Sequence, residues 1–310
     1  IVKQMRVPLG VIGMIYESRP NVTIDSAALC IKSGNSVILR GGSESMNSNK
    51  ALMKCIDNAF KKNKFHQHMV QLIETTDRSA VTHLLTKNQY IDVIIPRGGK
   101  GLIEKIVSCS KIPTIKHLDG NCHVYIDKTA DAKKAFDISI NSKTQRYGVC
   151  NAMETLLIHK SFPKKHITKI LNKYKEIGVE IRGCKNLIKI SSDIILAKET
   201  DWFEEYLSPI IAIKVVDSID DAINHIGKYG SLHTDAIIAS DKTMINKFKR
   251  LVNSSSVMIN TSTRFADGFE YGLGAEIGIS TDKLHVRGPV GFEGLTNLKY
   301  IVSSQGKLKN

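Results

Sequence analysis

Short apolar runs alternate with helix-like stretches along the first part of the chain. The apolar runs have the length of buried strands and lie at residues 11–16, 36–39, 70–73 and 91–95. Segments with the composition of helices follow them, at residues 23–32, 48–60, 79–85 and 101–108. Strands that alternate with helices in this way favour a doubly wound, mostly parallel sheet. The chain is therefore predicted to be an α/β protein that binds ligands at the carboxyl ends of its strands.

A second α/β unit is predicted after about residue 120. Its strands are expected at residues 155–158, 210–216, 236–239 and 256–260, and its helices at 130–142, 219–226 and 242–251. A glycine-rich, irregular stretch from 265 to 294 has the character of an active-site wall, and a short strand is expected at 300–303. The pattern divides the chain into two domains, 1–120 and 121–295, and a tail, 296–310.

Composition narrows the class of protein. The chain has 310 residues, 42% of them hydrophobic, and a net charge of +14. No apolar run reaches the roughly 18 residues of a membrane span, and no secretory signal leads the chain. Its six cysteines form no C-x-x-C pair, which favours reduced thiols in the cytoplasm over a zinc or disulfide framework. The lysines are dispersed rather than clustered with aromatics, which indicates either a general lysine-rich composition or an attraction for anionic ligands such as phosphorylated substrates. We expect neither nucleic acid nor membrane as partners.

Two glycine-rich turns follow predicted strands, and each contains a positively charged arginine. They contain Arg40, Gly41, Gly42 and Ser43 in one case, and Arg97, Gly98 and Gly99 in the other. Exposed backbone beside a cation suits a nucleotide, although neither turn has the G-x-G-x-x-G pattern and glycines also serve plain turns. A nucleotide site and a simple chain reversal both remain open from these residues alone.

Cys150 is the cysteine placed best for chemistry. It lies between Gly148 and Asn151 at a helix-to-strand connection, where a substrate could approach the sulfur. A reactive thiolate needs a neighbouring cation or dipole, and Lys143 and Arg146 are close in sequence. His117, Asp119 and His123 cluster around Gly120 near the domain boundary, and a histidine of this cluster could form a Cys–His pair with Cys150. A histidine at a strand end is at least as often structural. The alternative is that Cys150 is simply a small buried hydrophobic residue.

Beyond these patterns, ordered motifs over essentially the whole chain resemble the γ-glutamyl phosphate reductase family, which belongs to the aldehyde dehydrogenase superfamily. Besides the Cys150 segment, the matching runs are VPLGVIG at 7–13, YESRPN at 16–21, SGN at 33–35, ILRGG at 38–42, HLDG at 117–120, YGSLHTD at 229–235, NTSTRF at 260–265 and VRGPVG at 286–291.

The resemblance implies an aldehyde-dehydrogenase-like fold with a cofactor domain (1–120), a cysteine domain (121–295) and an oligomerisation strand in the tail. It implies NADPH-dependent reduction of L-glutamate 5-phosphate to L-glutamate 5-semialdehyde through a thioester on Cys150, in proline biosynthesis. Arg40 corresponds to a lysine beside the adenosine ribose. Neither Gly42 nor Ser43 is acidic, which fits the 2′-phosphate of NADP because a carboxylate there would repel it.

Further roles are carried over from the family. Glu205, in the run EEYLSP at 204–209, corresponds to a glutamate that contacts the nicotinamide ribose. Asn21 or Arg19 would complete an oxyanion site with the Cys150 backbone N–H. Arg264 is expected to meet the substrate carboxylate, and Arg146 is a further substrate-binding candidate.

Two departures from the family pattern are informative. Hydrolytic aldehyde dehydrogenases have a water-activating glutamate in an ELGG motif, whereas this chain has HLDG at 117–120. A reductase that works through a thioester has no use for that glutamate, because water would destroy the thioester. The chain also begins at the first strand of the cofactor domain, which suggests an incomplete N-terminus.

Alternative functions and partners remain in view. The alternatives are the reductase domain of a fused kinase–reductase, an aldehyde-oxidising relative, a non-catalytic fragment and a basic nucleic-acid-binding protein. A homo-oligomer joined through the strand near Ile301 and handover from a glutamate 5-kinase are the expected protein contacts.

Overall fold

The computed structural model describes residues 1–308, which form two compact units. Unit 1 comprises Ile1–Lys116 and the chain from Gly272 onward, and unit 2 comprises His117–Tyr271. The first division lies close to the expected boundary, but residues 272–295 group with unit 1 rather than with the cysteine domain. Their apolar side chains explain this difference, because Ile277, Val290 and Leu295 are buried in the core of unit 1.

Unit 1 is built on a four-stranded parallel sheet with the strand order β4-β3-β2-β5. The strands are β2 (Val11–Tyr16), β3 (Ser36–Arg40), β4 (Val70–Leu72) and β5 (Val93–Arg97), and the helices are α1 (Asn21–Ser33), α2 (Met46–Asn63), α3 (Ser79–Leu85) and α4 (Lys100–Cys109). The β-α alternation expected from the sequence is therefore present.

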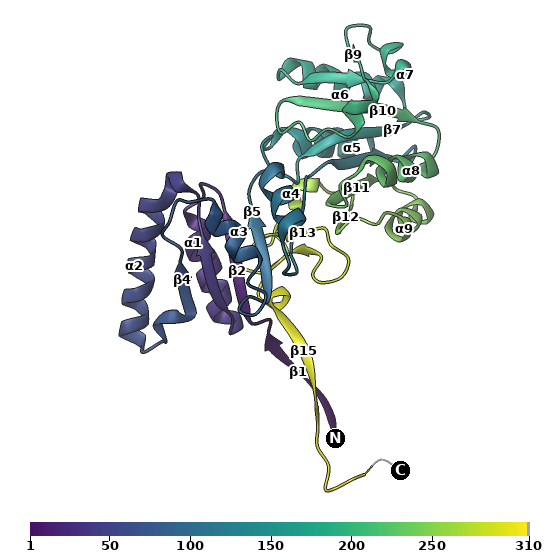
Figure 1. Ribbon diagram of the computed structural model, residues 1–310. Coiled ribbons are helices and arrows are strands. Elements are labelled where there is room, and N and C mark those ends of the chain that lie inside the picture. The colour runs from purple at the N-terminus through teal and green to yellow at the C-terminus, as the bar shows by residue number, and fades with distance from the viewer. Residues whose placement is uncertain (309–310) are drawn as a thin grey trace. The chain divides into compact units, whose positions relative to one another are not determined.

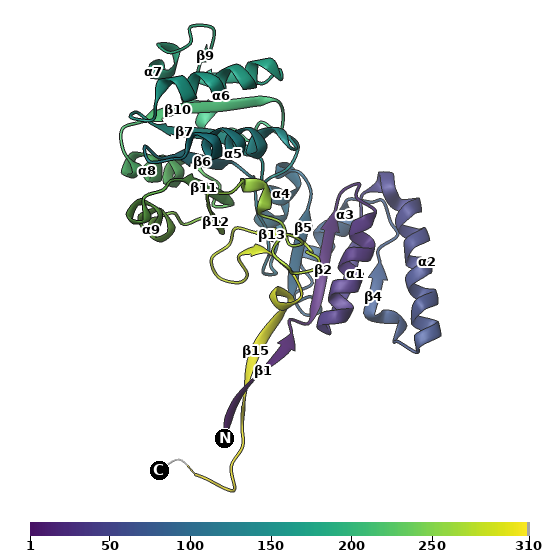
Figure 2. The same ribbon diagram turned by 180° about the vertical axis from the view of Figure 1, so that it is seen from behind.

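Alternating side chains of β2 are buried on the two opposite faces of this sheet. Ile12 and Met14 pack into the core that contains α1 and α2, whereas Ile15 packs with α3 and α4. One helix pair thus covers each face, as Figure 1 and Figure 2 show from opposite sides. The strand order changes direction between β2 and β5, and the carboxyl ends at such a switch point are where open α/β sheets bind ligands.

A two-stranded antiparallel ribbon also belongs to unit 1. It joins β1 (Val2–Pro8) to β15 (Thr296–Val302), with Ile301 opposite Lys3. The short strands β13 (Ile279–Ser280) and β14 (Gly288–Pro289) pair with each other and precede β15 in sequence. The strand expected near Ile301 therefore exists and is longer than predicted; within the chain it pairs with β1, and pairing with a neighbouring subunit stays a prediction.

Unit 2 is a seven-stranded parallel sheet with the order β12-β11-β6-β7-β10-β8-β9. Its strands are β6 (Cys122–Ile126), β7 (Met153–His159), β8 (Glu180–Gly183), β9 (Ile195–Leu196), β10 (Ile210–Val216), β11 (Thr234–Ile238) and β12 (Ser256–Ile259). Its helices are α5 (Ala132–Thr144), α6 (Lys164–Glu176), α7 (Lys185–Ile188), α8 (Ile219–Tyr229) and α9 (Lys242–Leu251).

Fully buried strands hold unit 2 together. Val124 and Leu156 face a core shared with α5 and α6, and Tyr125 and Leu157 face a core shared with α8 and α9. The central strands carry side chains that are buried on both faces, which is typical of a parallel sheet covered by helices. No helix among residues 1–308 is long and apolar enough to cross a bilayer.

Candidate active site

Cys150 lies on the connection from α5 to β7, and a buried ion pair fixes the two ends of that connection. Lys143, in the last turn of α5, donates to the Glu154 carboxylate on β7, and neither side chain is exposed to solvent. Burial opposes both charges: it lowers the pKa of Lys143 and raises the pKa of Glu154 to about 7. Lys143, which is close to Cys150 in sequence, is therefore paired with Glu154 and holds the loop.

The backbone of Cys150 is packed against Gly120. A Cβ on Gly120 would lie 1.9 Å from the Cys150 carbonyl oxygen and 2.4 Å from its Cα, so only glycine fits at this position. The Gly120 N–H donates to Glu205 Oε1 at 2.7 Å. This packing explains the glycine of the HLDG run and gives Glu205 a structural contact beside Cys150.

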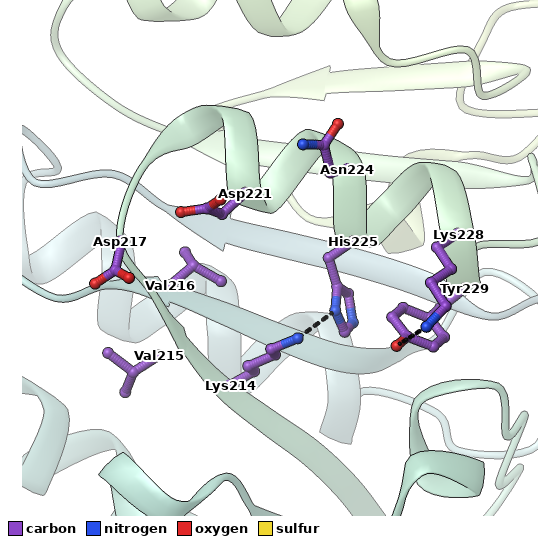
Figure 3. A pocket seen from close by; sticks show the side chains of 9 residues that line it. All are labelled: Lys214, Val215, Val216, Asp217, Asp221, Asn224, His225, Lys228 and Tyr229. Carbon is purple, nitrogen blue, oxygen red and sulfur yellow. Dashed lines mark hydrogen bonds between the residues drawn. The ribbon is translucent and has the colours of Figure 1, made fainter.

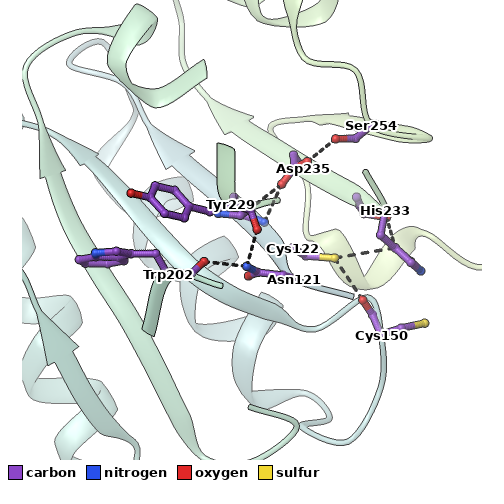
Figure 4. A network of polar contacts seen from close by, with 10 residues as sticks. Asn121, Cys122, Cys150, Trp202, Tyr229, His233, Asp235 and Ser254 are labelled. Atoms are coloured by element: carbon purple, nitrogen blue, oxygen red, sulfur yellow. Dashed lines mark hydrogen bonds and ion pairs between the residues drawn. The ribbon is translucent and has the colours of Figure 1, made fainter. Parts of the chain in front are cut away.

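A second cysteine holds Cys150 through its backbone. Cys122 Sγ donates to the Cys150 carbonyl oxygen at 3.1 Å and lies 3.8 Å from His233 Nδ1 (Figure 4). Complete burial raises the pKa of Cys122 well above its usual range, so this thiol stays protonated and keeps its donor. Cys122 is thus a support for the loop, and Cys150, which is half-buried, is the accessible sulfur of the two.

Two histidines lie beside the Cys150 sulfur. Ligand atoms of His117, Cys150 and His233 all lie within 4.8 Å of one another. Burial and the neighbouring His117 lower the pKa of His233 to about 3, so His233 is neutral at physiological pH. Of the two histidines that the sequence places near Gly120, His117 lies beside the sulfur, whereas His123 is buried and its Nδ1 pairs with Asp235 at 3.1 Å. His233 adds a second imidazole to which the sequence gives no role.

Arg264 and Arg146 place positive charge near Cys150. Arg264 is half-buried, and its Nε donates to Gln145 Oε1 at 2.8 Å. Burial lowers the pKa of Arg264, and its next strongest electrostatic partners are Cys150, which attracts it, and Arg146, which repels it. The structure therefore brings three of the residues expected to handle substrate into one region of unit 2, where an anionic group would be attracted.

In unit 1, the turn after β3 is held by Arg40. The residue is 8% exposed, and its guanidinium donates to the carbonyl oxygens of Gly41 at 2.8 Å and of Thr76 and Asp77 at 3.3 Å. Its Nε is buried with no hydrogen-bond partner among the described residues. Gly42 lies close to the chain after β2, since a Cβ on it would be 3.3 Å from the Ser18 nitrogen. Ser43 begins a short 3₁₀ helix.

The turn after β5 is already occupied by a carboxylate. Glu17 Oε2 accepts the Gly99 N–H at 2.8 Å, and a Cβ on Gly98 would lie 2.7 Å from the same carboxyl group. The negative charge at the start of α4 satisfies the helix end. A phosphate at this N–H would meet that charge, so the turn suits an uncharged nicotinamide better than a phosphate. Arg97 lies against Gly278 of the same unit.

Asn21 and Arg19 belong to unit 1, at the start of α1. Asn21 Nδ2 donates to Asp25 Oδ2 at 3.0 Å, and both Asn21 and Arg19 are exposed. Their expected roles at the oxyanion stay predictions.

A separate pocket of about 310 Å³ opens beside α8 in unit 2. Lys214 Nζ contacts His225 Nδ1 at 3.1 Å in its wall, and Lys228 Nζ donates to the Tyr229 hydroxyl at 2.7 Å (Figure 3). Tyr229 also connects the pocket to the residues that hold Cys150. Its carbonyl oxygen accepts a hydrogen bond from Asn121 Nδ2 at 2.9 Å, and Asn121 is next to Cys122 in the chain (Figure 4). The pocket therefore adjoins the framework of the site rather than its reactive sulfur.

Sequence reasoning missed several residues of this framework. It places His233 only within a family motif, and it gives Cys122, Glu154 and Glu17 no role. The available signal for Glu154 is a charged residue in a run of apolar ones, METLLI, since a carboxylate in a buried strand needs a partner. For Cys122 and His233 no local pattern exists, because residues far apart in sequence make their contacts.

Comparisons with known proteins agree with this description. The sequence profile of the aldehyde dehydrogenase family matches residues 2–183. γ-Glutamyl phosphate reductase from Ruthia magnifica subsp. Calyptogena magnifica is 57% identical over 308 residues, which are 99% of this chain and 74% of that protein.

Solved structures share the fold. Crystalline γ-glutamyl phosphate reductase from Thermotoga maritima matches with a TM-score of 0.98 at 44% identity, over 100% of this chain and 75% of that one. An acetylating aldehyde dehydrogenase from Geobacillus thermoglucosidasius matches with a TM-score of 0.76 at 19% identity, over 100% of this chain and 78% of its own. The α/β fold and the family resemblance predicted from the sequence are confirmed.

Proposed function

The chain belongs to the aldehyde dehydrogenase family, and we propose that it catalyses the γ-glutamyl phosphate reductase reaction of proline biosynthesis with Cys150 as nucleophile. The observation that carries the assignment of Cys150 is its setting. Its backbone is fixed by Gly120 and Cys122, its sulfur is half-buried rather than sealed, and Arg264 lies within its electrostatic reach.

The first step is an acyl transfer to sulfur. The Cys150 thiolate attacks the γ-carbonyl carbon of glutamyl phosphate, the carbon–oxygen bond to phosphate breaks, and a thioester and inorganic phosphate result. Arg264 and Arg146 attract the anionic substrate and stabilise the charge that leaves. His117 is the imidazole that accepts the thiol proton beforehand, since its ring lies beside the sulfur.

Residues of unit 1 fit a nicotinamide cofactor. The buried Nε of Arg40 has no partner among the described residues, and Gly42 leaves no room for a side chain beside Ser18. In this unit we assign the cofactor contacts to Arg40, Gly41, Gly42, Ser43, Arg97, Gly98 and Gly99. Glu205 of unit 2 is assigned to the cofactor only from its position in the family motif. When bound, NADPH supplies the hydride that reduces the thioester carbon.

The second step returns the enzyme to its starting state. The Cys150 N–H donates to the oxygen of the reduced thioester, and the carbon–sulfur bond then breaks to release the aldehyde. His117 stands where hydrolytic relatives have the water-activating glutamate, so that glutamate is absent from this run. This arrangement favours reduction over hydrolysis and disfavours the aldehyde-oxidising alternative.

The cellular setting follows from the chemistry. An acyl phosphate is short-lived in water, so direct handover from a glutamate 5-kinase is advantageous. We place the protein in the cytoplasm as a homo-oligomer, with Ile301 in the contacting strand.

The test runs the reaction backwards, because the acyl phosphate is unstable. NADPH formation is followed from glutamate semialdehyde, NADP and phosphate, with the Cys150→Ala and Cys122→Ala variants alongside. We expect phosphate-dependent activity that Cys150→Ala abolishes and that Cys122→Ala retains in part. Equal rates without phosphate would overturn the acyl-phosphate assignment, and an active Cys150→Ala variant would overturn the nucleophile. Replacing NADP by NAD in the same assay tests the cofactor preference.

A further inference from the structure

The proposed reaction does not need all of the polar side chains that surround Cys150. A thiol and two imidazoles converge from three segments: His117 precedes β6, Cys150 precedes β7 and His233 precedes β11. Their ligand atoms lie within 4.8 Å of one another, and no carboxylate belongs to the group. One imidazole is enough to handle the thiol proton, so the second is unexplained by the mechanism.

His233 presents a nitrogen that lacks a partner. Its Nδ1 contacts Thr234 Oγ1 at 2.8 Å, which fixes the ring, while its Nε2 is buried and has no hydrogen-bond partner within residues 1–308. The whole residue is 1% exposed. Buried polar atoms without partners are uncommon in native proteins and call for a missing ligand. In Figure 4 the outer part of this ring lies on the same side as the Cys150 sulfur.

We propose that His117, Cys150 and His233 form a binding site for a thiophilic divalent cation of the Zn²⁺ class. Sulfur and imidazole nitrogen are the ligands that zinc prefers, and a site without carboxylates discriminates against magnesium and calcium. Three protein ligands leave one of four tetrahedral positions for water. Binding releases the thiol proton, forms a metal–sulfur bond and displaces water from the ion, so no redox partner is needed.

The same ion would act as a reversible block of the reaction. Its bond to sulfur removes the lone pair that attacks the substrate, so the ion competes with acylation of Cys150. This consequence, unlike the binding itself, rests on the proposed function of Cys150. Arg264 opposes the ion electrostatically, because it carries the same sign of charge near the sulfur. Neutralising Arg264 should therefore strengthen metal binding even though it removes an anion-binding group.

Cobalt titration of the intact protein tests the site without any assay of turnover. Co²⁺ is added to the reduced protein, and the near-ultraviolet thiolate-to-cobalt band and the visible bands of tetrahedral cobalt are recorded. We expect one equivalent to bind and Zn²⁺ to remove both signals. Cys150→Ala should abolish the thiolate band, His233→Ala should weaken binding at least tenfold, by the order of a lost ligand, and Arg264→Gln should tighten it.

Matched variants keep the outcome interpretable. Cys184→Ala removes another half-buried thiol of unit 2 and should leave the titration unchanged. In the unmodified protein, Zn²⁺ should slow alkylation of Cys150 and not of Cys55, an exposed thiol, as read by mass spectrometry of the peptides. A thiolate band that persists in Cys150→Ala, or the absence of any band in the unmodified protein, would overturn the site. Cobalt bands in a protein without reductase activity would leave the metal site standing and count against the proposed function.

Discussion

The two sheets place different chemistry at different ends: the candidate cofactor turns of unit 1 follow the carboxyl ends of its strands, whereas Cys150 and His233 of unit 2 precede the amino ends of β7 and β11. In unit 1 the ends of β3 and β5 present glycines and main-chain groups, and the one charged residue described there as buried is Arg40. Unit 2 buries a whole set of ionisable side chains around its strands, among them Lys143, Glu154, His233 and Asp235. Each of these has a polar contact, which is the condition for keeping such groups inside a protein.

This difference corresponds to two tasks. A surface that holds a large cofactor needs close backbone approach and can be assembled from turns. A nucleophile must be held within a fraction of an ångström, and buried polar networks provide that rigidity at a cost in stability. Unit 2 should therefore be the more sensitive to removal of single polar groups, and unit 1 the more sensitive to added side-chain volume.

Breaking the Lys143–Glu154 pair should have the largest effect on stability. Lys143→Met leaves a buried carboxylate without its partner, and we expect a loss of about 3–5 kcal/mol in the free energy of unfolding. The double variant Lys143→Met, Glu154→Leu should recover most of that loss. Urea unfolding of the two variants measures the difference; a single variant as stable as the unmodified protein would show that the pair does not hold the Cys150 loop.

The next largest effect, this time on kcat, is expected from adding one methyl group at Gly120. The Cβ of Gly120→Ala collides with the Cys150 backbone, and a shift of the order of 1 Å in a nucleophile lowers kcat by about 100-fold. Gly227→Ala is the control, because no atom lies within 4 Å of its Cβ and alanine favours the helix α8. Similar kcat values for both variants would mean that Gly120 does not position Cys150.

Acid should destabilise unit 2 through His225. Burial, followed by His123 and Lys214, lowers the pKa of His225 to about 2, whereas an unfolded histidine takes up a proton near pH 6.5. The unfolded state thus binds the extra proton first, and stability falls as pH drops below about 6.5. The His225 share of the loss should reach about 2 kcal/mol at pH 5.

His225→Gln isolates that contribution. Its free energy of unfolding should decline less between pH 7.5 and pH 5 than that of the unmodified protein, when both are measured by urea unfolding. An equal decline in the two proteins would assign the acid sensitivity to other groups.

The smallest effect should come from Gly98 in unit 1. A methyl group there lies 2.7 Å from the Glu17 carboxyl and disturbs the start of α4, whereas at Gly99 the nearest atom is 3.9 Å away. We expect Gly98→Ala to raise KM for NADPH by about tenfold with little change in stability, on the scale of one lost contact. Steady-state kinetics of Gly98→Ala and Gly99→Ala separate this local effect from a general intolerance of the turn.

The repeating architecture is predictable from the sequence because that information is local. The apolar runs of β2, β3 and β10 and the helices α1 and α2 lie within a few residues of their expected positions. The strand β6 is not among the predicted elements, because a uniformly buried strand next to polar turns has no periodicity of its own. The helix α6 is also absent from them, although its buried residues recur at helical spacing. The assignment of residues 272–295 failed for a related reason, because glycine-rich chain gives no sign of which core will bury its few apolar residues.

The site shows the same limit. Cys150 and the two glycine turns are recognisable from local residues and family motifs. Lys143 is close to Cys150 in sequence, but the α5 helix directs this side chain into the core, toward Glu154. The contacts of His233 with the nucleophile join residues more than eighty positions apart, and no local pattern predicts such a pairing.

The most direct test of Cys150 as a thioester-forming nucleophile is a rapid-mixing measurement without phosphate. Glutamate semialdehyde and NADP are mixed with the protein, and NADPH is recorded over the first turnover. If Cys150 forms a thioester that water does not cleave readily, NADPH should appear in a burst of about one per chain and then stall until phosphate is added. Cys150→Ala should give no burst. A steady rate without phosphate, or a burst that survives in Cys150→Ala, would contradict the central claim.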